Sequence, residues 1–489
     1  MKHATTIATG SLLASVATAA SGVVTWDIAK RGGKLPTKIS KRASSDTVTE
    51  IIDNKFQLGG YFATVTVGTP PQNLTLQLDT GSSDIWVPST EACEALESSS
   101  SSSSGKCNLG SYEHNNSDSY ELVNHDFDIS YVDGSSSRGD YITETFAIGD
   151  VSLTNVTMGN ADTTDIPYGL VGVGYKTNEA APTVYDNLPV VMYNEGRINT
   201  IAYSLWLNDL DSSTGSIMFG GIDTDKYKGD LIRVDVQPDP RYTTKTITSF
   251  MVQLSGVTAH SSSGDDSLGG TFPVSVVLDS GTTLSYLPTE LADEIYNEVG
   301  AQFYQGFPLV PCSLADKEGY FAFAFGGKDG PVIQVGLDEL VLDAGLGTFP
   351  SGQYEGEQAC EFGIFNTTEA PYLLGDTFLR SAYVVYDLEN NEVGLANTDF
   401  NATSSKIVAF SSQGAPIPSS TAAPNQDDVA STGGNSDNAG SGFQSGGSSS
   451  GTGDDSGAMS LSAMTWTQMV TIGATMSFMM VGGAFSILF

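Results

Sequence analysis

The sequence predicts an all-β protein, mainly antiparallel and divided into two similar lobes. Between residues 50 and 400, short runs of aromatic and β-branched residues are separated by turn signals, whereas helical patterns are few and short. One phrase occurs twice, since residues 76–82 (LQLDTGS) and 276–282 (VVLDSGT) each end an apolar run with Asp, a hydroxyl residue, Gly and another hydroxyl residue. About 360 residues remain once the two ends are set aside, and this length suits two domains.

The strand predictions begin with residues 60–68, which are rich in aromatic and β-branched residues and end at the turn signal Thr69-Pro70-Pro71. The best helix prediction covers residues 290–303, with Thr289 as the candidate N-cap. Further short strands are predicted around residues 141–148, 216–219, 249–258, 274–278, 332–336 and 383–387.

The repeated phrase predicts one Asp-containing turn in each lobe, with Asp79 and Asp279 delivered to a shared site. A later segment of two apolar residues and Gly follows each phrase, at residues 170–172 and at residues 373–375. We expect each segment to pass beside its Asp turn and to brace it. Chance explains one such segment, but the same order in both halves favours a structural repeat.

Acidic residues greatly outnumber basic ones. The 57 Asp and Glu residues against 21 Lys and Arg residues give a formal charge of −36, and the pI is near 4.1. A nucleic-acid-binding protein would be basic, so that class is disfavoured. Because the chain loses negative charge as the pH falls toward its pI, self-repulsion is smallest in acid, which suits an acid environment. The alternative is that the charge serves only solubility.

Both ends of the chain have the pattern of targeting and processing signals. Residues 1–20 begin with Lys2 and His3 and continue through small and apolar residues, which predicts a secretory signal peptide. Residues 21–42 are basic and end in the dibasic pair Lys41-Arg42, which predicts a propeptide cut by a processing protease. An ordinary basic tail is the alternative.

The C-terminal end predicts a lipid anchor. Residues 403–457 are rich in Ser, Gly, Asn and Asp and are expected to form an extended stalk. Residues 458–489 end in an uncharged apolar run, and the small residues around Ser456 precede a polar spacer, which is the pattern of a GPI-attachment signal removed on maturation. A tail anchor and a buried helix are the alternatives. The predicted location is the outer face of the plasma membrane, or the cell wall after transfer.

Four cysteines in a secreted chain imply two disulfides, for which three pairings exist. The simplest pairing is Cys93–Cys107 and Cys312–Cys360, with one bridge in each lobe. A metal site is disfavoured because the chain has no CxxC motif and its four His residues are scattered. Glycosylation sequons occur at Asn73, Asn115, Asn155, Asn366 and Asn401.

Residues 79–88 (DTGSSDIWVP) and 279–283 (DSGTT) resemble the two active-site motifs of pepsin-like aspartic proteases. The similarity covers roughly residues 50–400, and residues 172–180 (GVGYKTNEA) and 378–383 (FLRSAY) are similar to stretches of the fungal candidapepsin and yapsin group. This resemblance implies a bilobal pepsin-like fold, with lobes over residues 43–235 and 236–402. It also implies a cleft between the lobes, peptide and protein substrates and no cofactor. Two motifs in one chain make a homodimer unnecessary, so we expect a monomer.

The resemblance makes Asp79 and Asp279 the catalytic pair. Two carboxylates in contact cannot both ionise cheaply, so the pair keeps one proton, as aspartic proteases do as a class. The ionised member takes a proton from a bridging water that attacks the peptide carbonyl, and the protonated member donates to the carbonyl oxygen. The pair titrates as a unit, so neither Asp is assigned the proton.

The residues after each Asp have predicted supporting roles. Gly81 and Gly281 allow the backbone to approach closely and to donate N–H bonds to the carboxylates. Ser82 and Thr282 are expected to donate hydroxyl bonds to the outer carboxylate oxygens. The alternative for each phrase is a plain Asx turn.

Residues 131–135 (YVDGS) resemble the flap of this family, a hairpin tip that closes over substrate. Tyr131 is expected to cover the cleft and to hydrogen-bond toward Trp86, although Val132 stands where many relatives have Gly. An ordinary hairpin turn is the alternative. The full set of flap and substrate-binding candidates is Tyr131, Asp133, Gly134, Ser135, Trp86 and Thr283.

Two further hypotheses concern specificity and function. Glu91, Glu94 and Glu97 lie in a loop beside the first Cys, where they would favour Lys or Arg in the substrate; a solvated acidic loop is the alternative. The sequence as a whole favours a secreted, GPI-anchored aspartic endopeptidase that acts in acid. The alternative is a catalytically silent cell-wall binding or adhesion protein on the same fold, which the intact Asp pair and Tyr131 disfavour.

Overall fold

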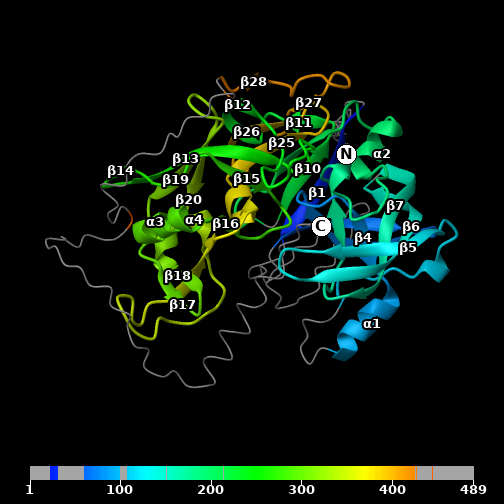
Figure 1. Cartoon of the computed structure of the whole chain (residues 1–489), viewed down its shortest axis with the longest axis horizontal. Helices are drawn as coiled ribbons and strands as arrows, with labels where there is room; N and C mark the ends of the chain where they lie inside the picture. Colours follow the sequence, from blue (N-terminus) through cyan, green and yellow to red (C-terminus); the bar gives the residue numbers. More distant parts are fainter. Residues whose placement is uncertain are drawn as a thin grey trace, which may run out of the picture.

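The computed structural model describes residues 22–30, 60–99, 107–149, 151–212 and 214–424, together with residues 426 and 443. Within these residues the chain is mostly strand and forms two lobes joined by a central sheet (Figure 1). The prediction of an all-β, two-lobed protein is therefore confirmed. The predicted signal peptide, the dibasic pair at residues 41–42, Ser456 and residues 458–489 lie outside the described residues.

The largest sheet has 14 strands and begins in the N-terminal lobe. In β6, which contains the predicted strand 141–148, Ile142, Phe146 and Ile148 are buried at the two-residue period of a strand. The N-terminal-lobe strands of this sheet, in spatial order, are β2 (Tyr61–Val67), β3 (Gln72–Asp79), β8 (Leu170–Gly172), β4 (Ile85–Pro88), β7 (Val151–Thr164), β6 (Ser136–Ile148) and β5 (Glu121–Ser130).

The other half of this sheet joins the two lobes. Val384, from the second half of the chain, is paired with Leu205 from the first half, so the lobes share one continuous sheet. The strands of this central part, in spatial order, are β28 (Ser420–Ala422), β12 (Tyr227–Asp235), β26 (Glu392–Thr398), β25 (Ala382–Asp387), β9 (Ala202–Trp206), β10 (Thr214–Phe219) and β1 (Val24–Lys30).

Strand β1 lies inside the predicted propeptide, residues 21–42. It pairs with β10, where Val24 faces Phe219, and with β2, and the side chain of Ile28 is buried. Part of this segment is therefore an internal strand of the central sheet. Its removal by a protease stays a prediction.

The C-terminal lobe contains an eight-stranded sheet and a four-stranded sheet, and a two-stranded sheet lies beside the central strands. The eight strands are β20 (Val332–Gly336), β19 (Gly319–Phe325), β13 (Met251–Ser261), β15 (Val274–Leu278), β24 (Tyr372–Leu374), β16 (Ser285–Pro288), β23 (Ile364–Thr367) and β14 (Gly264–Ser267). The smaller sheets are formed by β17 (Gln302–Tyr304), β18 (Phe307–Pro311), β22 (Ala359–Phe362) and β21 (Val341–Leu342), and by β11 (Gly221–Asp223) with β27 (Ile407–Ala409).

Helices are few in the described residues. The helix predicted at residues 290–303 is present but its bounds were wrong, because it begins at Thr289 with Pro288 as the N-cap and ends at Val299. Gly300 adopts a left-handed conformation (φ 67°) that ends the helix, and the chain then enters β17. The α-helices are α1 (Thr90–Ser99), α2 (Leu188–Asn194), α3 (Thr289–Val299), α4 (Leu337–Leu340) and α5 (Asp376–Leu379).

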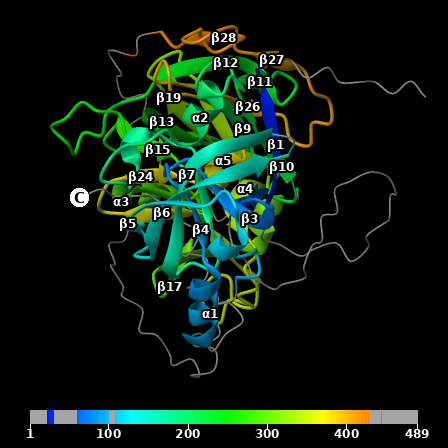
Figure 2. The same ribbon diagram turned by 90° about the vertical axis from the view of Figure 1, so that its right-hand side faces the viewer.

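The predicted end of the C-terminal lobe at residue 402, and the stalk from residue 403, are wrong for residues 403–424. This segment, which we call the C-terminal strap, adds β27 and β28 and lies over the central sheet (Figures 1 and 2). Its Phe410 and Ile417 are buried against outward-facing residues of β9 and β25. The Ser-rich composition concealed these spaced apolar residues, which bury enough surface to fold. Further along, Phe443 is also buried, against Phe321.

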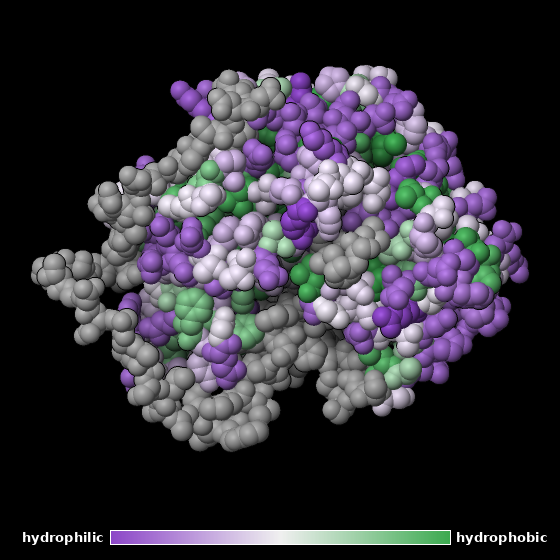
Figure 3. Space-filling view, in the orientation of Figure 1, coloured by the Kyte–Doolittle hydropathy of each residue, from purple (hydrophilic) through white to green (hydrophobic). Residues whose placement is uncertain are grey.

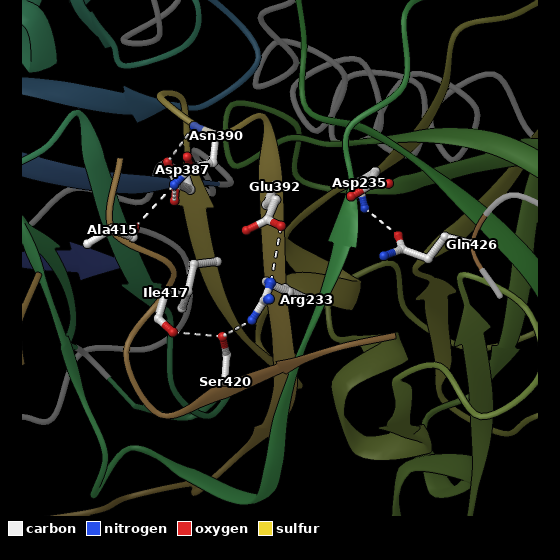
Figure 4. A network of polar contacts seen from close by, with 9 residues as sticks. All are labelled: Arg233, Asp235, Asp387, Asn390, Glu392, Ala415, Ile417, Ser420 and Gln426. Atoms are coloured by element: carbon white, nitrogen blue, oxygen red, sulfur yellow. Dashed lines mark hydrogen bonds and ion pairs between the residues drawn. The ribbon is translucent and has the colours of Figure 1, made fainter. Parts of the chain in front are cut away.

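Polar contacts fasten the strap to the central strands (Figure 4). The Asn390 side chain donates to the Ala415 carbonyl oxygen at 3.1 Å, and Arg233 donates to the Ser420 hydroxyl at 3.2 Å. Beyond β28, the backbone N–H of Asp235 donates to the Gln426 side chain at 2.6 Å. Hydrogen bonds therefore hold the strap to the central strands, in addition to the packing of its apolar side chains.

Both predicted disulfides are present, Cys93–Cys107 and Cys312–Cys360, with Cα–Cα distances of 5.7 and 4.9 Å. The described residues on the face drawn in Figure 3 are mainly hydrophilic, with apolar residues in small patches. None of the helices described here is long and apolar enough to cross a membrane. All five sequon asparagines are exposed, as glycosylation requires, and their occupancy stays a prediction: Asn73, Asn115, Asn155, Asn366 and Asn401.

Candidate active site

The two Asp turns meet between the lobes and are tied together through the residue after each Asp. The Thr80 hydroxyl donates to the Leu278 carbonyl oxygen at 3.0 Å, and the Ser280 hydroxyl donates to the Leu78 carbonyl oxygen at 3.1 Å. Each hydroxyl also accepts the other's backbone N–H, at 2.9 and 3.2 Å. Sequence reasoning missed this role, although both phrases carry a hydroxyl residue at this position. The four bonds fix the two turns in register.

Each carboxylate is held by its own turn as predicted. Asp79 accepts the Gly81 N–H at 2.8 Å through Oδ1 and the Ser82 hydroxyl through Oδ2. Asp279 accepts the Gly281 N–H at 2.8 Å through Oδ1 and the Thr282 hydroxyl at 2.6 Å through Oδ2. The arrangement in one lobe repeats that in the other, so both carboxyl planes are fixed in advance of any reaction.

The two carboxyl groups are in direct contact and completely buried. A Cβ atom on Gly81 would lie 2.5 Å from Asp279 Oδ1, so only glycine allows the first turn to approach the second carboxyl this closely. Burial raises the pKa of Asp79 well above its ordinary value, and the charge of Asp279 raises it further. Burial likewise raises the pKa of Asp279. The pair therefore retains a proton at a pH where isolated Asp residues are ionised.

The apolar-apolar-Gly segments brace the Asp turns, as predicted. Asp79 faces Gly172 in the parallel pairing of β3 with β8, and Leu278 faces Leu374 in the pairing of β15 with β24. A Cβ on Gly172 would lie 2.7 Å from backbone atoms of the first turn, and one on Gly375 would lie 2.3 Å from carbonyl oxygens of the second. Glycine is required because each segment crosses its turn at backbone contact distance.

The hairpin of β5 and β6 has its tip at residues 131–135. The Trp86 Nε1–H donates to the Tyr131 hydroxyl at 2.6 Å, which confirms the predicted contact, and Tyr131 is buried. Asp133 Oδ1 accepts the backbone N–H and the hydroxyl of Ser135, at 2.9 and 2.7 Å. These two residues bind each other, so their contact with substrate stays a prediction.

Two smaller features of the tip and cleft bear on substrate binding. Gly134 has φ +85°, which glycine adopts readily, whereas the neighbouring Val132 is exposed. Thr283, half-buried beside the second Asp turn, has a hydroxyl without a hydrogen-bond partner among the described residues. That hydroxyl oxygen is itself buried, and the role of Thr283 in substrate binding stays a prediction.

The acidic residues near the first Cys were predicted to lie in a loop, and this was wrong. Glu91, Glu94 and Glu97 lie on helix α1 at three-residue spacing and are exposed. Their proposed preference for basic substrates stays a hypothesis.

One group of potential metal ligands occurs in the described part of the chain, and it does not support a metal site. It consists of Cys312, Asp343 and Cys360, and the two sulfur atoms are joined in a disulfide. Disulfide sulfurs are not thiolates, so they do not act as thiolate ligands to a metal ion.

Comparison with known proteins agrees with this geometry. Residues 60–398 match the family model of the eukaryotic aspartyl proteases, and the chain therefore belongs to this family. It is an aspartic-type endopeptidase. It is 42% identical over 401 residues to a probable aspartic-type endopeptidase OPSB of Arthroderma benhamiae, covering 79% of this chain and 78% of the relative.

Other relatives give the same result. The chain is 40% identical over 412 residues to the probable aspartic-type endopeptidase opsB of Aspergillus oryzae, covering 82% of this chain and 81% of the relative. It is 36% identical over 348 residues to the secreted aspartic protease 8 of Candida albicans, covering 71% of this chain and 77% of the relative. The resemblance to fungal aspartic proteases is thus confirmed.

Proposed function

We propose that Asp79 and Asp279 are the catalytic pair of this endopeptidase. The observation that carries the proposal is the contact between two buried carboxyl groups, each held by the N–H and the hydroxyl group of its own turn. The pair shares one proton, so one member is ionised and removes a proton from a water between them. That water attacks the peptide carbonyl, while the protonated member donates to the carbonyl oxygen. Each of these proton transfers contributes about 100- to 10,000-fold to the rate.

The flap residue Tyr131 completes the site from the N-terminal lobe. Its hydroxyl bond to Trp86 fixes the ring, and burial raises its pKa well above the ordinary value, with the charge of Asp79 adding to the effect. Tyr131 therefore stays neutral and acts as an apolar cover with one fixed polar tip. We assign it the role of excluding water from the bond being cut.

The first experiment is cleavage of a denatured protein near pH 4 by the wild type and by Asp79→Asn and Asp279→Asn. We expect both variants to fold and to lose activity, since an amide cannot accept the proton from water. Equal cleavage by all three proteins would exclude these residues as the catalytic pair.

We further propose that the enzyme is secreted and held outside the cell by a GPI anchor, after cleavage at Lys41-Arg42. The small residues around Ser456 and the uncharged apolar end support the anchor, and the relative named as secreted supports export. The test is release of activity from intact cells by a phosphatidylinositol-specific phospholipase. Activity that stays with the cells after this treatment, and after digestion of the wall, would contradict the anchor.

A further inference from the structure

A second pair of buried carboxyl groups lies beside the first, and the mechanism above does not use it. Asp84 lies within the first motif, on the turn after Asp79, and is completely buried. Its Oδ1 accepts the hydroxyl of Tyr141 at 3.0 Å and the hydroxyl of Tyr185 at 2.7 Å, and its Oδ2 accepts the Ala180 N–H at 2.8 Å. Three donors converge on one side chain, so Asp84 is the junction of three segments.

Those three segments all belong to the surroundings of the catalytic pair. Asp84 lies on the turn that carries Asp79, and its carbonyl oxygen accepts the N–H of Gly172 at 3.0 Å. Tyr141 lies on β6, one of the two flap strands. Tyr185 and Ala180 lie on residues 176–187, which we call the side segment. Its Asn178 donates to the Gly81 carbonyl oxygen at 3.1 Å.

A chain of aromatic contacts leads from this junction to the flap tip. The ring of Tyr141 meets Phe127 edge-on at 5.3 Å between centroids, and Phe127 lies 6.4 Å from Trp86. Trp86 in turn donates to the Tyr131 hydroxyl. Because these rings are packed in one buried cluster, a displacement of Tyr141 changes the position of Tyr131.

Glu179 is the second member of the pair and is nearly as buried as Asp84, with 2% of its surface exposed. Its Oε2 accepts the Tyr185 N–H at 2.8 Å, whereas its Oε1 has no hydrogen-bond partner in the described part of the chain. Burial raises its pKa to about 8, and the charge of Asp84 adds to the effect. Glu179 is therefore neutral in acid.

The charged groups around Glu179 would not neutralise the negative charge that it gains when it ionises. Asp84 faces it from the catalytic turn, with the hydroxyl groups of Tyr141 and Tyr185 nearby. On the side segment, Lys176 is the cation that acts on Glu179, and it is exposed and paired with Asp186 at 3.2 Å. Ionised Glu179 would thus repel ionised Asp84 at a place where both side chains are buried.

We propose that Asp84 is a positioning residue that holds the flap strand and the side segment against the catalytic turn, and that Glu179 confines this arrangement to acid by separating from Asp84 when it ionises. The inference rests on the proposed catalytic role of Asp79 and Asp279. It goes beyond that role because neither Asp84 nor Glu179 contacts the reacting atoms. The tests of the junction can be told apart from the tests of the catalytic pair. Loss of the catalytic pair should abolish cleavage, whereas loss of the junction should only reduce it.

The first test is Tyr141→Phe, with Tyr185→Phe as the matched variant on the side segment. The Tyr141 hydroxyl is one of three donors to a buried carboxyl, and its loss leaves an oxygen of Asp84 with one donor fewer, so kcat/KM for a fluorogenic peptide at pH 4 should fall about tenfold in Tyr141→Phe. The fall should be smaller in Tyr185→Phe, which lies off the flap. If Tyr141→Phe keeps kcat/KM within twofold of the wild type, Asp84 positions nothing for catalysis and the proposal is wrong.

The second test uses Glu179→Gln, which cannot ionise, in an Asp279→Asn background that binds the peptide without cutting it and in which the titration of Asp79 is common to parent and variant. Binding of the same peptide is measured by fluorescence anisotropy from pH 4 to pH 9, with near-UV circular dichroism to confirm folding at each pH. We expect affinity in the parent to fall about tenfold as Glu179 ionises near pH 8, and to stay within about twofold in Glu179→Gln.

Glu361→Gln is the control, because it neutralises an equally buried carboxyl on β22, in the other lobe. It should lose affinity with pH as the parent does. The proposal is overturned if Glu179→Gln follows the parent, or if Glu361→Gln abolishes the pH dependence equally well. The second result would assign the effect to the stability of the whole fold.

Discussion

Replacing Glu361 by Gln should stabilise the protein at neutral pH and leave its stability in acid nearly unchanged. Glu361 lies in β22, opposite Leu309 and Leu342 of the neighbouring strands, and is completely buried. Neither of its carboxylate oxygens has a hydrogen-bond partner in the described part of the chain. Burial without a donor or a cation raises its pKa from 4.5 to about 7. Ionisation of such a buried carboxyl in the folded chain is costly.

The sign of the effect follows from the two pKa values. Below pH 4.5 Glu361 is protonated in the folded and the unfolded chain, so its contribution to stability is fully present. As the pH rises from 4.5 to about 7, the unfolded chain releases the proton while the folded chain keeps it, and the free energy of unfolding falls. At about 1.4 kcal/mol for each pH unit, the loss above pH 7 reaches about 3 kcal/mol. Glu361→Gln does not incur this loss.

The assay is urea unfolding followed by near-UV circular dichroism at pH 4 and pH 8. An Asp279→Asn background prevents self-digestion of the unfolded chain. We expect the Gln variant to be more stable than its parent by about 3 kcal/mol at pH 8, and to differ by less than about 1 kcal/mol at pH 4. Glu357→Gln, an exposed control in the same lobe, should show neither effect. An equal difference at both pH values would refute the reasoning, because it would not depend on ionisation.

Three further predictions concern the catalytic turn, the strap and the disulfides. Gly81→Ala should reduce kcat/KM at least about 100-fold without unfolding the protein, because its Cβ would lie 2.5 Å from Asp279 Oδ1 and separate the carboxyl groups. Phe410→Ala should lower the free energy of unfolding in urea by about 3–5 kcal/mol, whereas Ile407→Ala, at a position 42% exposed, should change it by less than about 1 kcal/mol. Replacing both Cys312 and Cys360 by Ser should lower the free energy of unfolding by about 4 kcal/mol, and replacing both Cys93 and Cys107 should lower it by about 3 kcal/mol. The difference is expected because Cys312–Cys360 spans 48 residues and Cys93–Cys107 spans 14.

Most of the fold could be predicted because local and global signals agree over residues 60–398. The predicted strands at residues 274–278 and 332–336 coincide with β15 and β20, where β-branched residues alternate or run together between turn signals. The segments at residues 170–172 and 373–375 were identified from their order alone. They could be found because close backbone crossing leaves glycine as the permitted residue.

The errors occurred where tertiary contacts decide the structure. Phe410 and Ile417 are isolated apolar residues in a polar segment, and composition gives no sign that β9 and β25 present an uncovered face to them. The sequence likewise showed no sign that part of the predicted propeptide forms strand β1, for which β10 and β2 leave a position in the central sheet. The residue pattern of one segment does not show whether strands elsewhere in the chain leave a position for that segment beside them.

The same limit applies to the site. The roles of Gly81, Ser82 and Thr282 could be predicted because each is a neighbour of a catalytic candidate in the sequence. The junction at Asp84 could not, since Tyr141 and Glu179 come from segments 57 and 95 residues further along the chain and no local motif requires them to lie near Asp84. A hydrophobic neighbourhood around an Asp is visible in the sequence, but its hydrogen-bond donors are not.

The acidic residues of this chain act in two different ways that favour the same pH. On the surface, the net charge of −36 makes self-repulsion increase as the pH rises above the pI. In the interior, Asp84, Glu179 and Glu361 each have a raised pKa, so the folded chain binds protons that the unfolded chain releases. Both effects make the fold most stable in acid. The catalytic pair needs one shared proton, so the pH that favours the fold also favours the reaction. We therefore expect the interior, as well as the active site, to limit this enzyme to acid.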